Sequence, residues 1–412
     1  MNSYKDAFNQ EPSCIDGLNF EYLNDGLNDF VMANRTIHSY FRRRDSHELI
    51  IFLSAVGLKG KPYPIFHRVS WENHFDGNIL CFDDPTRNEI DFAPCFYFGD
   101  AQHNLLEQIN AIVCKIAQNL NIKNKDIFII SSSNGGFAAM YLANKILDST
   151  CIALCPQFDV DLFFDGNKLF YSKLNINRDD YLHRLNLFDV IDNDRSKFII
   201  YSNIMCPSDK IQIDSFCSSH GISYKIGLNI IKSNFFLIIS KINAVHPHTA
   251  QPNEFFCRLI KRHLFKDSLL INDFIDVYLQ LLKSYYEQEL CNQITNKVNQ
   301  YLSNIKRIEF HDDFIDIFVN DVINSFFRIY DFRNEKIIVS FRIKNFTKYL
   351  AIEQVWNWAK KHNFAINNTS SDINIYSKYL IHFSEIGFWY NEIMINCFNE
   401  NLIFHQKGKI GN

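Results

Sequence analysis

Short apolar runs alternate with longer amphipathic segments over residues 48–266 of the chain. Between the runs, apolar residues recur at helical spacing over 104–120, and we expect further helices at 134–147 and about 209–219. Strands that are apolar throughout are typical of a parallel sheet covered on both faces. The pattern therefore predicts an α/β fold with a mainly parallel sheet flanked by helices. The predicted strands are 48–56 (ELIIFLSAV), 77–85 (GNILCFDDP), 126–130 (DIFII), 149–156 (STCIALCP), 197–204 (KFIIYSNI), a segment near 223–229, and 234–242 (NFFLIISKI).

The segment 157–196 interrupts this rhythm. It is rich in Asp, Asn, Phe and Tyr and lies between two predicted strands. Ligands of open parallel sheets gather at the carboxyl ends of the strands. We therefore interpret 157–196 as a possible lid over a site at those ends.

The pattern changes after about residue 266. Residues 269–290 carry apolar side chains at helical spacing, and FFRIYDF and KIIVSFRI read as the two strands of a hairpin. A further helix is predicted at 346–362. We expect two domains, a catalytic domain over 1–266 and a smaller α+β module over 267–412 whose role the sequence leaves open.

Composition excludes some classes of protein. The chain has 412 residues, 47% of them hydrophobic, which is enough for two or three domains with real cores. The formal net charge of −4 gives no reason to expect nucleic-acid binding. The run Arg42-Arg43-Arg44 is short and is followed by Asp45, which favours a solvated face over a phosphate or lipid site.

The cysteines indicate a reducing compartment. There are eleven, an odd number with no CxxC pair, and Cys81, Cys151 and Cys155 lie in apolar runs. Reduced buried thiols fit this pattern better than disulfides or a zinc site, so we expect no metal. The N-terminus lacks a signal-peptide pattern, and no apolar run approaches the roughly 20 residues of a transmembrane helix. We expect a cytoplasmic protein, with peripheral contact at the inner membrane face left open.

A strand-to-helix junction, IISSSNGGFAAMYLA at 129–143, carries the first candidate chemistry. A nucleophile elbow follows G-x-S-x-G, in which a strained turn exposes the central serine. Here the pattern reads Ser131-Ser132-Ser133-Asn134-Gly135, with serine in place of the first glycine. We predict Ser133 as the nucleophile, with Ser132 as the fallback. The alternative is an ordinary connection that caps a helix or holds a phosphate.

A serine nucleophile needs a base, usually a histidine oriented by a carboxylate. In this arrangement the chain order is serine, acid, histidine. Asp209 follows the strand at 197–204 in a Pro/Ser loop and is the predicted acid, with Asp214 as the fallback. His248 is the preferred base because the chain leads from Thr249 into the last helix, and His246 is the alternate base.

An oxyanion would need backbone N–H donors. The N–H of Asn134 lies at the start of the helix after the elbow. The exit of the early strand, at Ala55, Val56 and Gly57, is the predicted source of a second donor.

Together these motifs resemble the α/β-hydrolase-fold capsule polysaccharide O-acetyltransferases of bacteria. The resemblance covers about residues 45–265, although the first elbow glycine and the glycines before the histidine are absent. More loosely, it extends to hydrolase-like proteins of surface-glycan and adhesin export systems. The resembling motifs are Leu53-Ser54-Ala55, the elbow Ser131-Ser132-Ser133-Asn134-Gly135-Gly136, Cys155-Pro156-Gln157, the Asp209 loop and the His246/His248 segment.

The resemblance implies an α/β-hydrolase-like catalytic domain that acetylates a glycan through an acyl-Ser133 intermediate. It implies acetyl-coenzyme A as acyl donor, a polysaccharide or other glycan as acceptor, and capsule-assembly proteins as possible partners. Two alternatives stay open at this point. The same residues with water as acceptor would make an esterase, and a non-catalytic scaffold in glycan assembly or export would need none of them.

Overall fold

The computed structural model describes residues 11–20, 23–32, 34–56, 64–163, 167–244, 246–263 and 268–299, together with seven strands between 307 and 382. The chain divides into two compact units. The first comprises Met1–Lys241 and His248–Leu282, and the second comprises Ile242–Pro247 and Lys283–Asn412.

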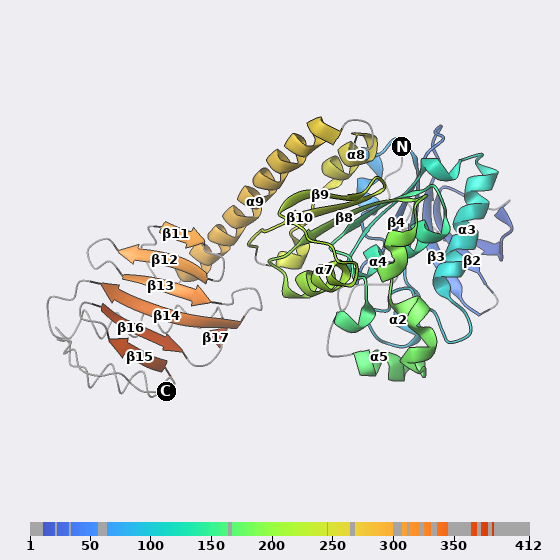
Figure 1. The fold of residues 1–412 in the computed structure, drawn as a ribbon. Coiled ribbons are helices and arrows are strands. Elements are labelled where there is room, and N and C mark those ends of the chain that lie inside the picture. The colour runs from blue at the N-terminus through green and yellow to red at the C-terminus, as the bar shows by residue number, and fades with distance from the viewer. Residues whose placement is uncertain are drawn as a thin grey trace. The chain divides into compact units, whose positions relative to one another are not determined.

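The first unit is built on a ten-stranded sheet (Figure 1). Neighbouring strands from β5 to β10 all run parallel, whereas β3 and β9 pair antiparallel with their neighbours. The predicted mainly parallel sheet is thus confirmed. In spatial order the strands are β1 (Ser13–Asp16), β2 (Gly26–Val31), β3 (Thr36–Arg42), β5 (Asn78–Phe82), β4 (Leu49–Leu53), β6 (Ile127–Ser132), β7 (Thr150–Leu154), β8 (Lys197–Asn203), β10 (Phe235–Ser240) and β9 (Gly227–Lys232).

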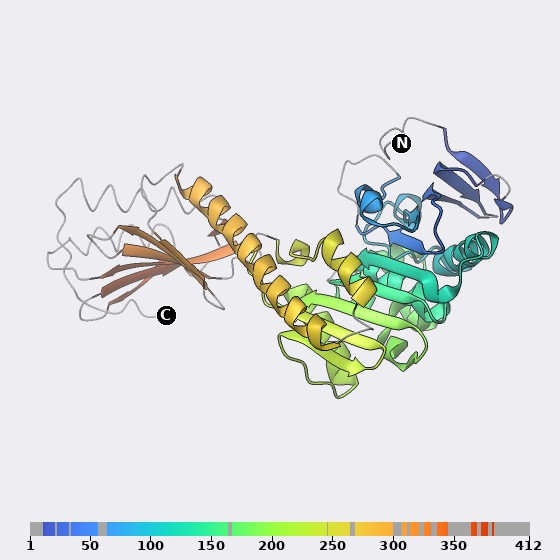
Figure 2. The same ribbon diagram turned by 90° about the horizontal axis from the view of Figure 1, so that it is seen from above.

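Helices cover both faces of this sheet (Figure 2). Successive strand residues point to opposite faces, so Ile51 joins one core and its neighbour Ile50 joins the other. On the first face pack α3 (Leu105–Asn119), α4 (Ser133–Lys145) and α7 (Pro207–Ser219), and on the second α8 (Glu254–His263) and the start of α9 (Ser268–Asn299). Short helices complete the unit at α2 (Thr86–Glu89), α5 (Asn167–Leu174) and α6 (Leu182–Leu185), with 3₁₀ turns at Val69–His74, Asn124–Asp126, Val160–Leu162, Arg178–Tyr181, Phe188–Asp192 and Pro247–Thr249.

The sequence of α3 explains why a helix forms at this position. The side chain of Asn104 accepts a hydrogen bond from the N–H of Leu106 and so caps the first turn. Its apolar side chains recur at helical spacing and are buried against the sheet, and each leucine, isoleucine or valine contributes roughly 1.5–3 kcal/mol through burial. The buried residues are Leu105, Leu106, Ile109, Ile112, Val113, Ile116 and Ala117.

The segment 157–196 is a packed part of the first unit. Phe158, Val160 and Phe170 are fully buried in the core on the side of α3 and α4. Its chain is held by hydrogen bonds such as that from the N–H of Phe158 to Gln212 Oε1, at 2.8 Å. These contacts make it an integral insertion between β7 and β8.

The first unit continues past residue 266, where the sequence had placed the boundary. Within α9, Ile275 and Leu279 are buried in the core beneath α8. Phe256 of α8 stacks on Phe274 and packs against Tyr278, with ring centroids 6.1 and 4.5 Å apart. The compact unit therefore extends to Leu282.

The second unit contains an antiparallel sheet. Its strands β13 and β14 form the hairpin that the sequence predicted. The predicted helix at 346–362 lies outside the described residues. In order the strands are β11 (Arg307–Phe310), β12 (Phe314–Asn320), β13 (Ser325–Tyr330), β14 (Lys336–Lys344), β16 (Asp372–Ser377) and β15 (Phe364–Asn368), with β17 (Ile381–His382) on β14.

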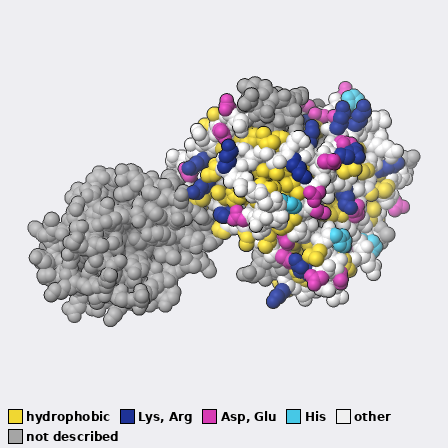
Figure 3. Space-filling model, viewed as in Figure 1, with side chains coloured by type: hydrophobic (Ala, Val, Ile, Leu, Met, Phe, Trp, Pro, Cys, Tyr) yellow, Lys and Arg dark blue, Asp and Glu magenta, His cyan; other side chains and the backbone are white. Residues whose placement is uncertain are grey.

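The surface carries mixed charge. On the face drawn in Figure 3, Lys and Arg side chains of the first unit are interspersed with Asp and Glu. Among the helices of the described segments, none combines the length and apolar character that crossing a membrane requires.

Candidate active site

Ser133 lies at the junction of β6 and α4 with an unusual backbone. Its φ of 55° is in the left-handed region, which costs a residue other than glycine roughly 1–2 kcal/mol. Ser132 takes the N-cap position of α4, but its side chain makes no capping hydrogen bond. The serines of this turn therefore do not serve as helix caps, and the strain places Ser133 at the positive end of α4.

The strand and helix of the elbow pass so closely that only small residues fit. A Cβ on Gly135 would lie 2.4 Å from Ser131 Oγ and 2.8 Å from the carbonyl oxygen of Ser54. Ser131 occupies the position of the missing first glycine, and its hydroxyl donates to the carbonyl oxygen of Leu53. Serine is tolerated at position 131 because β4 lies close enough for the Ser131 hydroxyl to donate this hydrogen bond.

Asp209 and His248 form a buried pair. Asp209 Oδ1 lies 2.7 Å from His248 Nδ1, and the aspartate side chain is fully buried while that of the histidine is 30% exposed. The structure places Asp209 in the first turn of α7, whereas the sequence had suggested a loop. Burial disfavours the imidazolium, yet the hydrogen bond to Asp209 and the interaction with Cys206 outweigh it and raise the pKa of His248 well above 6.5.

Ser133 and His248 open into one pocket of about 380 Å³. The hydroxyl of Ser133 donates to Gln157 Oε1 at 3.3 Å in this conformation. Gln157 belongs to the segment 157–196 and contacts Ser133, whereas the described residues that line the pocket come from other segments. The described lining consists of Ala55, Val56, His67, Arg68, Trp71, Ser132, Ser133, His248, Thr249 and Gln251.

Two of the three fallback residues, Asp214 and His246, lie outside the described lining of the pocket. Asp214 pairs with Lys210 and accepts a hydrogen bond from the hydroxyl of Tyr224 at 2.6 Å. His246 is exposed and belongs to the second unit, whereas His248 belongs to the first. Ser132 lines the pocket beside Ser133.

The predicted oxyanion donors are only partly free. The N–H of Ala55 donates to His67 Nδ1 at 2.8 Å, so it is occupied in this conformation and offers no free donor. Val56 lines the pocket, Asn134 lies in the first turn of α4, and Gly57 lies outside the described residues. Donation from Asn134 and Val56 to an oxyanion stays a prediction.

His67 was not predicted, although it touches the pocket. Burial and the charges of Arg68 and Arg87 lower the pKa of His67 to about 4, so its ring is neutral at pH 7. Because Nδ1 accepts from Ala55, we assign the proton to Nε2. His67, Arg68 and Trp71 follow a stretch with no regular apolar period, and no spacing in the sequence marks them as site residues.

Cys155 lies beside Asp209 and His248. Its thiol and the ligand atoms of Asp209 and His248 lie within 4.8 Å of one another. Cys155 is fully buried, and burial first, then the charge of Asp209, raise the pKa of its thiol well above the usual range. This disfavours the thiolate that a metal would need, so we interpret the trio as a hydrogen-bonded cluster.

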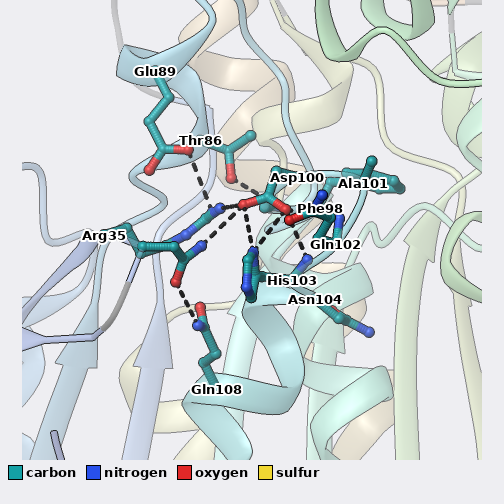
Figure 4. A network of polar contacts seen from close by, with 12 residues as sticks. Arg35, Thr86, Glu89, Phe98, Asp100, Ala101, Gln102, His103, Asn104 and Gln108 are labelled. Atoms are coloured by element: carbon teal, nitrogen blue, oxygen red, sulfur yellow. Dashed lines mark hydrogen bonds and ion pairs between the residues drawn. The ribbon is translucent and has the colours of Figure 1, made fainter.

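A second polar cluster surrounds Asp100 (Figure 4). The side chain of Arg35 is only 2% exposed and pairs with both Asp100 and Glu89. Burial would raise the pKa of Asp100, but hydrogen bonds from the backbone N–H groups of His103 and Gln102 and from Asn34 lower it to about 2. Opposite charges are matched here, which is typical of a structural network joining β3 to the start of α3.

The strand order and the site together define an α/β-hydrolase fold. The strained Ser133 follows β6, Asp209 follows β8 and His248 follows β10, which matches the serine, acid, histidine order of that fold.

The similarity to known proteins is low. No family model matches the sequence, and no curated protein matches it. Among solved structures, a capsule O-acetyltransferase of Neisseria meningitidis serogroup A is similar over 58% of this chain and 93% of that one, at 18% identity and a TM-score of 0.42.

Other solved structures are similar at comparable levels. A glycosylation-associated protein complex from Streptococcus agalactiae shares 14% identity over 52% of this chain and 41% of that one, with a TM-score of 0.40. Dipeptidyl peptidase 4 of Porphyromonas gingivalis shares 11% identity over 59% of this chain and 36% of that one, with a TM-score of 0.39. At such values the likeness carries no information about the reaction.

Proposed function

We propose that the first unit is a serine acyltransferase that O-acetylates a capsular or other surface polysaccharide. One observation carries the proposal: a strained serine and a histidine paired with a buried aspartate open into the same pocket. Acetyl-coenzyme A is the proposed acyl donor, and capsule-assembly proteins are the proposed partners. These last assignments come from the motif resemblance in the sequence.

The first half-reaction transfers the acyl group to the protein. Neutral His248 takes the proton of the Ser133 hydroxyl at Nε2, because Nδ1 is held by Asp209. The Ser133 oxygen attacks the thioester carbon, and the carbonyl electron pair moves to oxygen, where the N–H groups of Asn134 and Val56 stabilise it. Collapse breaks the carbon–sulfur bond, and the departing thiolate takes the proton from His248.

The second half-reaction returns the serine. A sugar hydroxyl gives its proton to His248 and attacks the acyl carbon of Ser133. Collapse of this second intermediate breaks the bond to Ser133, whose oxygen recovers the proton from His248. The products are the acetylated glycan and the free hydroxyl of Ser133.

Hydrolysis is the second candidate. The side chain of His248 is 30% exposed, so water can reach the base. The same residues would then act as a carboxylesterase with water in place of the sugar hydroxyl.

Release of coenzyme A from acetyl-coenzyme A, followed with and without added polysaccharide, tests the proposal. We expect release that depends on the polysaccharide and that falls about 10³-fold or more in Ser133→Ala. Ser132→Ala is the matched control, because Ser132 lines the same pocket and should leave the rate within a few-fold. Release that is independent of polysaccharide would favour the esterase, and equal rates in Ser133→Ala and the wild type would refute the proposed nucleophile.

A further inference from the structure

Arg68 is a cation in the wall of the Ser133 pocket. It lines the pocket together with Ser133 and His248. Its φ of 63° is left-handed, which is strained for arginine. Arg68 thus adopts an unfavourable backbone conformation at the point where its cationic side chain lines the pocket.

The charge of Arg68 has no anionic partner among the described residues. Its Nη2 donates to the neutral Gln251 Oε1 at 3.2 Å, and its buried Nε has no hydrogen-bond partner. The guanidinium lies 5.1 Å from the ring centre of Trp71. Burial lowers the pKa of Arg68 to about 10, which leaves the group charged at neutral pH.

Arg35 shows what the same unit does with another sheltered arginine. Arg35 pairs with Glu89 and Asp100, as buried charges generally do. Among the described residues, Arg68 contacts an amide and an aromatic ring but pairs with no carboxylate. Its positive charge is therefore available to an anion that enters the pocket.

The surroundings hold Arg68 close to the base. Gln251 accepts from Arg68 and donates through Nε2 to the carbonyl oxygen of His248 at 2.7 Å. On the other side, Trp71 packs edge-on against Phe52 of β4, with ring centroids 6.2 Å apart. The Gln251 amide thus links the Arg68 guanidinium to the segment that carries His248. The Trp71 ring lies against the same guanidinium.

We propose that Arg68 binds a carboxylate or phosphate group of the acceptor, so that the acceptor is an acidic sugar unit. This rests on the proposed function, because it concerns the molecule that reacts at Ser133. A pocket of about 380 Å³ is at the small end of the roughly 300–1,000 Å³ of ligand sites, so it suits one sugar unit. Coenzyme A carries its phosphates at the far end of the long pantetheine arm, away from the thioester, which favours the acceptor as the source of the anion.

The test is equilibrium binding by calorimetry to the full chain, with no acyl donor present. The probes are glucuronic acid, glucose 6-phosphate, neutral glucose and coenzyme A. We expect one or both acidic sugars to bind at least about tenfold more tightly than glucose, and their affinity to fall about tenfold or more in Arg68→Gln. Arg68→Lys keeps the charge without the planar fork and should lose less.

Arg195→Gln is the matched control, because it removes the same charge from an exposed pair with Asp148. Equal binding of glucose and both acidic sugars, no binding of either acidic sugar, or an equal loss in Arg195→Gln would overturn the proposal. So would a loss in Arg68→Gln confined to coenzyme A, which would assign the anion to the donor. Near-ultraviolet circular dichroism of each variant confirms that it is folded.

Labelling of Ser133 by a neutral fluorophosphonate, run in parallel, separates this proposal from the proposed function. Labelling without Arg68-dependent binding of acidic sugars would leave the nucleophile in place and refute the subsite. Arg68-dependent binding without labelling would support an acidic-sugar site and refute the acyl transfer.

Discussion

At the residue scale, the proposed chemistry depends on three side chains that the chain order brings from three strand ends. Ser133, Asp209 and His248 were predictable because each follows an apolar strand that is easy to recognise. His67 and Arg68 were not, because they lie in an irregular segment and their environment is created by tertiary packing. The hydrogen bond from the N–H of Ala55 to His67 occupies a predicted oxyanion donor, and it could not be predicted from the sequence for the same reason.

The pH dependence expected for the proposed reaction follows from the raised pKa of His248. Only the neutral imidazole can accept a proton, so kcat/KM should rise with pH through a pKa above 6.5. In Asp209→Asn the attraction of the carboxylate is lost while burial remains, so the midpoint should move to lower pH. The plateau rate should also fall by about 10³–10⁴-fold, because the imidazole is no longer held in the productive tautomer.

Initial rates from pH 5 to pH 11 measure both effects, because burial is outweighed by the hydrogen bond to Asp209 and the interaction with Cys206, which raise the pKa of His248 to about 10. Ser132→Ala serves as the control, since it should keep the midpoint of the wild type. A midpoint that stays in place in Asp209→Asn would show that another group governs the titration.

At the element scale, the elbow is where strand, turn and helix depend on each other. The apolar strands β4 to β8 and the helices α3 and α4 were predictable from periodicity. β2 was missed because it buries Asn28, whose amide donates to the carbonyl oxygens of Asn24 and Gly26, so its inner face reads as polar. β9 begins later than predicted and buries Asn229 in the same way.

The strain at the elbow predicts a difference between two variants that both lack the hydroxyl. Ser133→Ala keeps a Cβ in the left-handed region, whereas Ser133→Gly does not. We expect Ser133→Gly to have the larger free energy of unfolding, by about 1 kcal/mol. Urea unfolding at constant pH measures this difference, and greater stability of Ser133→Ala would show that the turn is not left-handed in solution.

At the scale of the whole molecule, the sequence indicated two parts but placed their boundary too early. The change in hydrophobic pattern after residue 266 marks the start of α9, but a periodic stripe does not reveal which partner a helix packs against. In the structure Ile275 and Leu279 complete the core of the first unit. The strands of the second unit form their own antiparallel sheet.

The position of the boundary predicts how truncated chains behave. A chain ending at residue 266 lacks Ile275 and Leu279, and it exposes the ring of Phe256. We expect it to be less stable than a chain ending at residue 289 by about 2–5 kcal/mol, the range for losing large buried aliphatic side chains. Urea unfolding compares the two, and equal stability would show that the start of α9 does not belong to the first unit.

The most direct test of the whole account is to locate the reactive residue by mass spectrometry after treatment with a fluorophosphonate. The account predicts one adduct, on the peptide that contains Ser133, formed much more slowly in His248→Ala than in His246→Ala. Folded protein that gains no adduct, or an adduct on any residue other than Ser133, would contradict it.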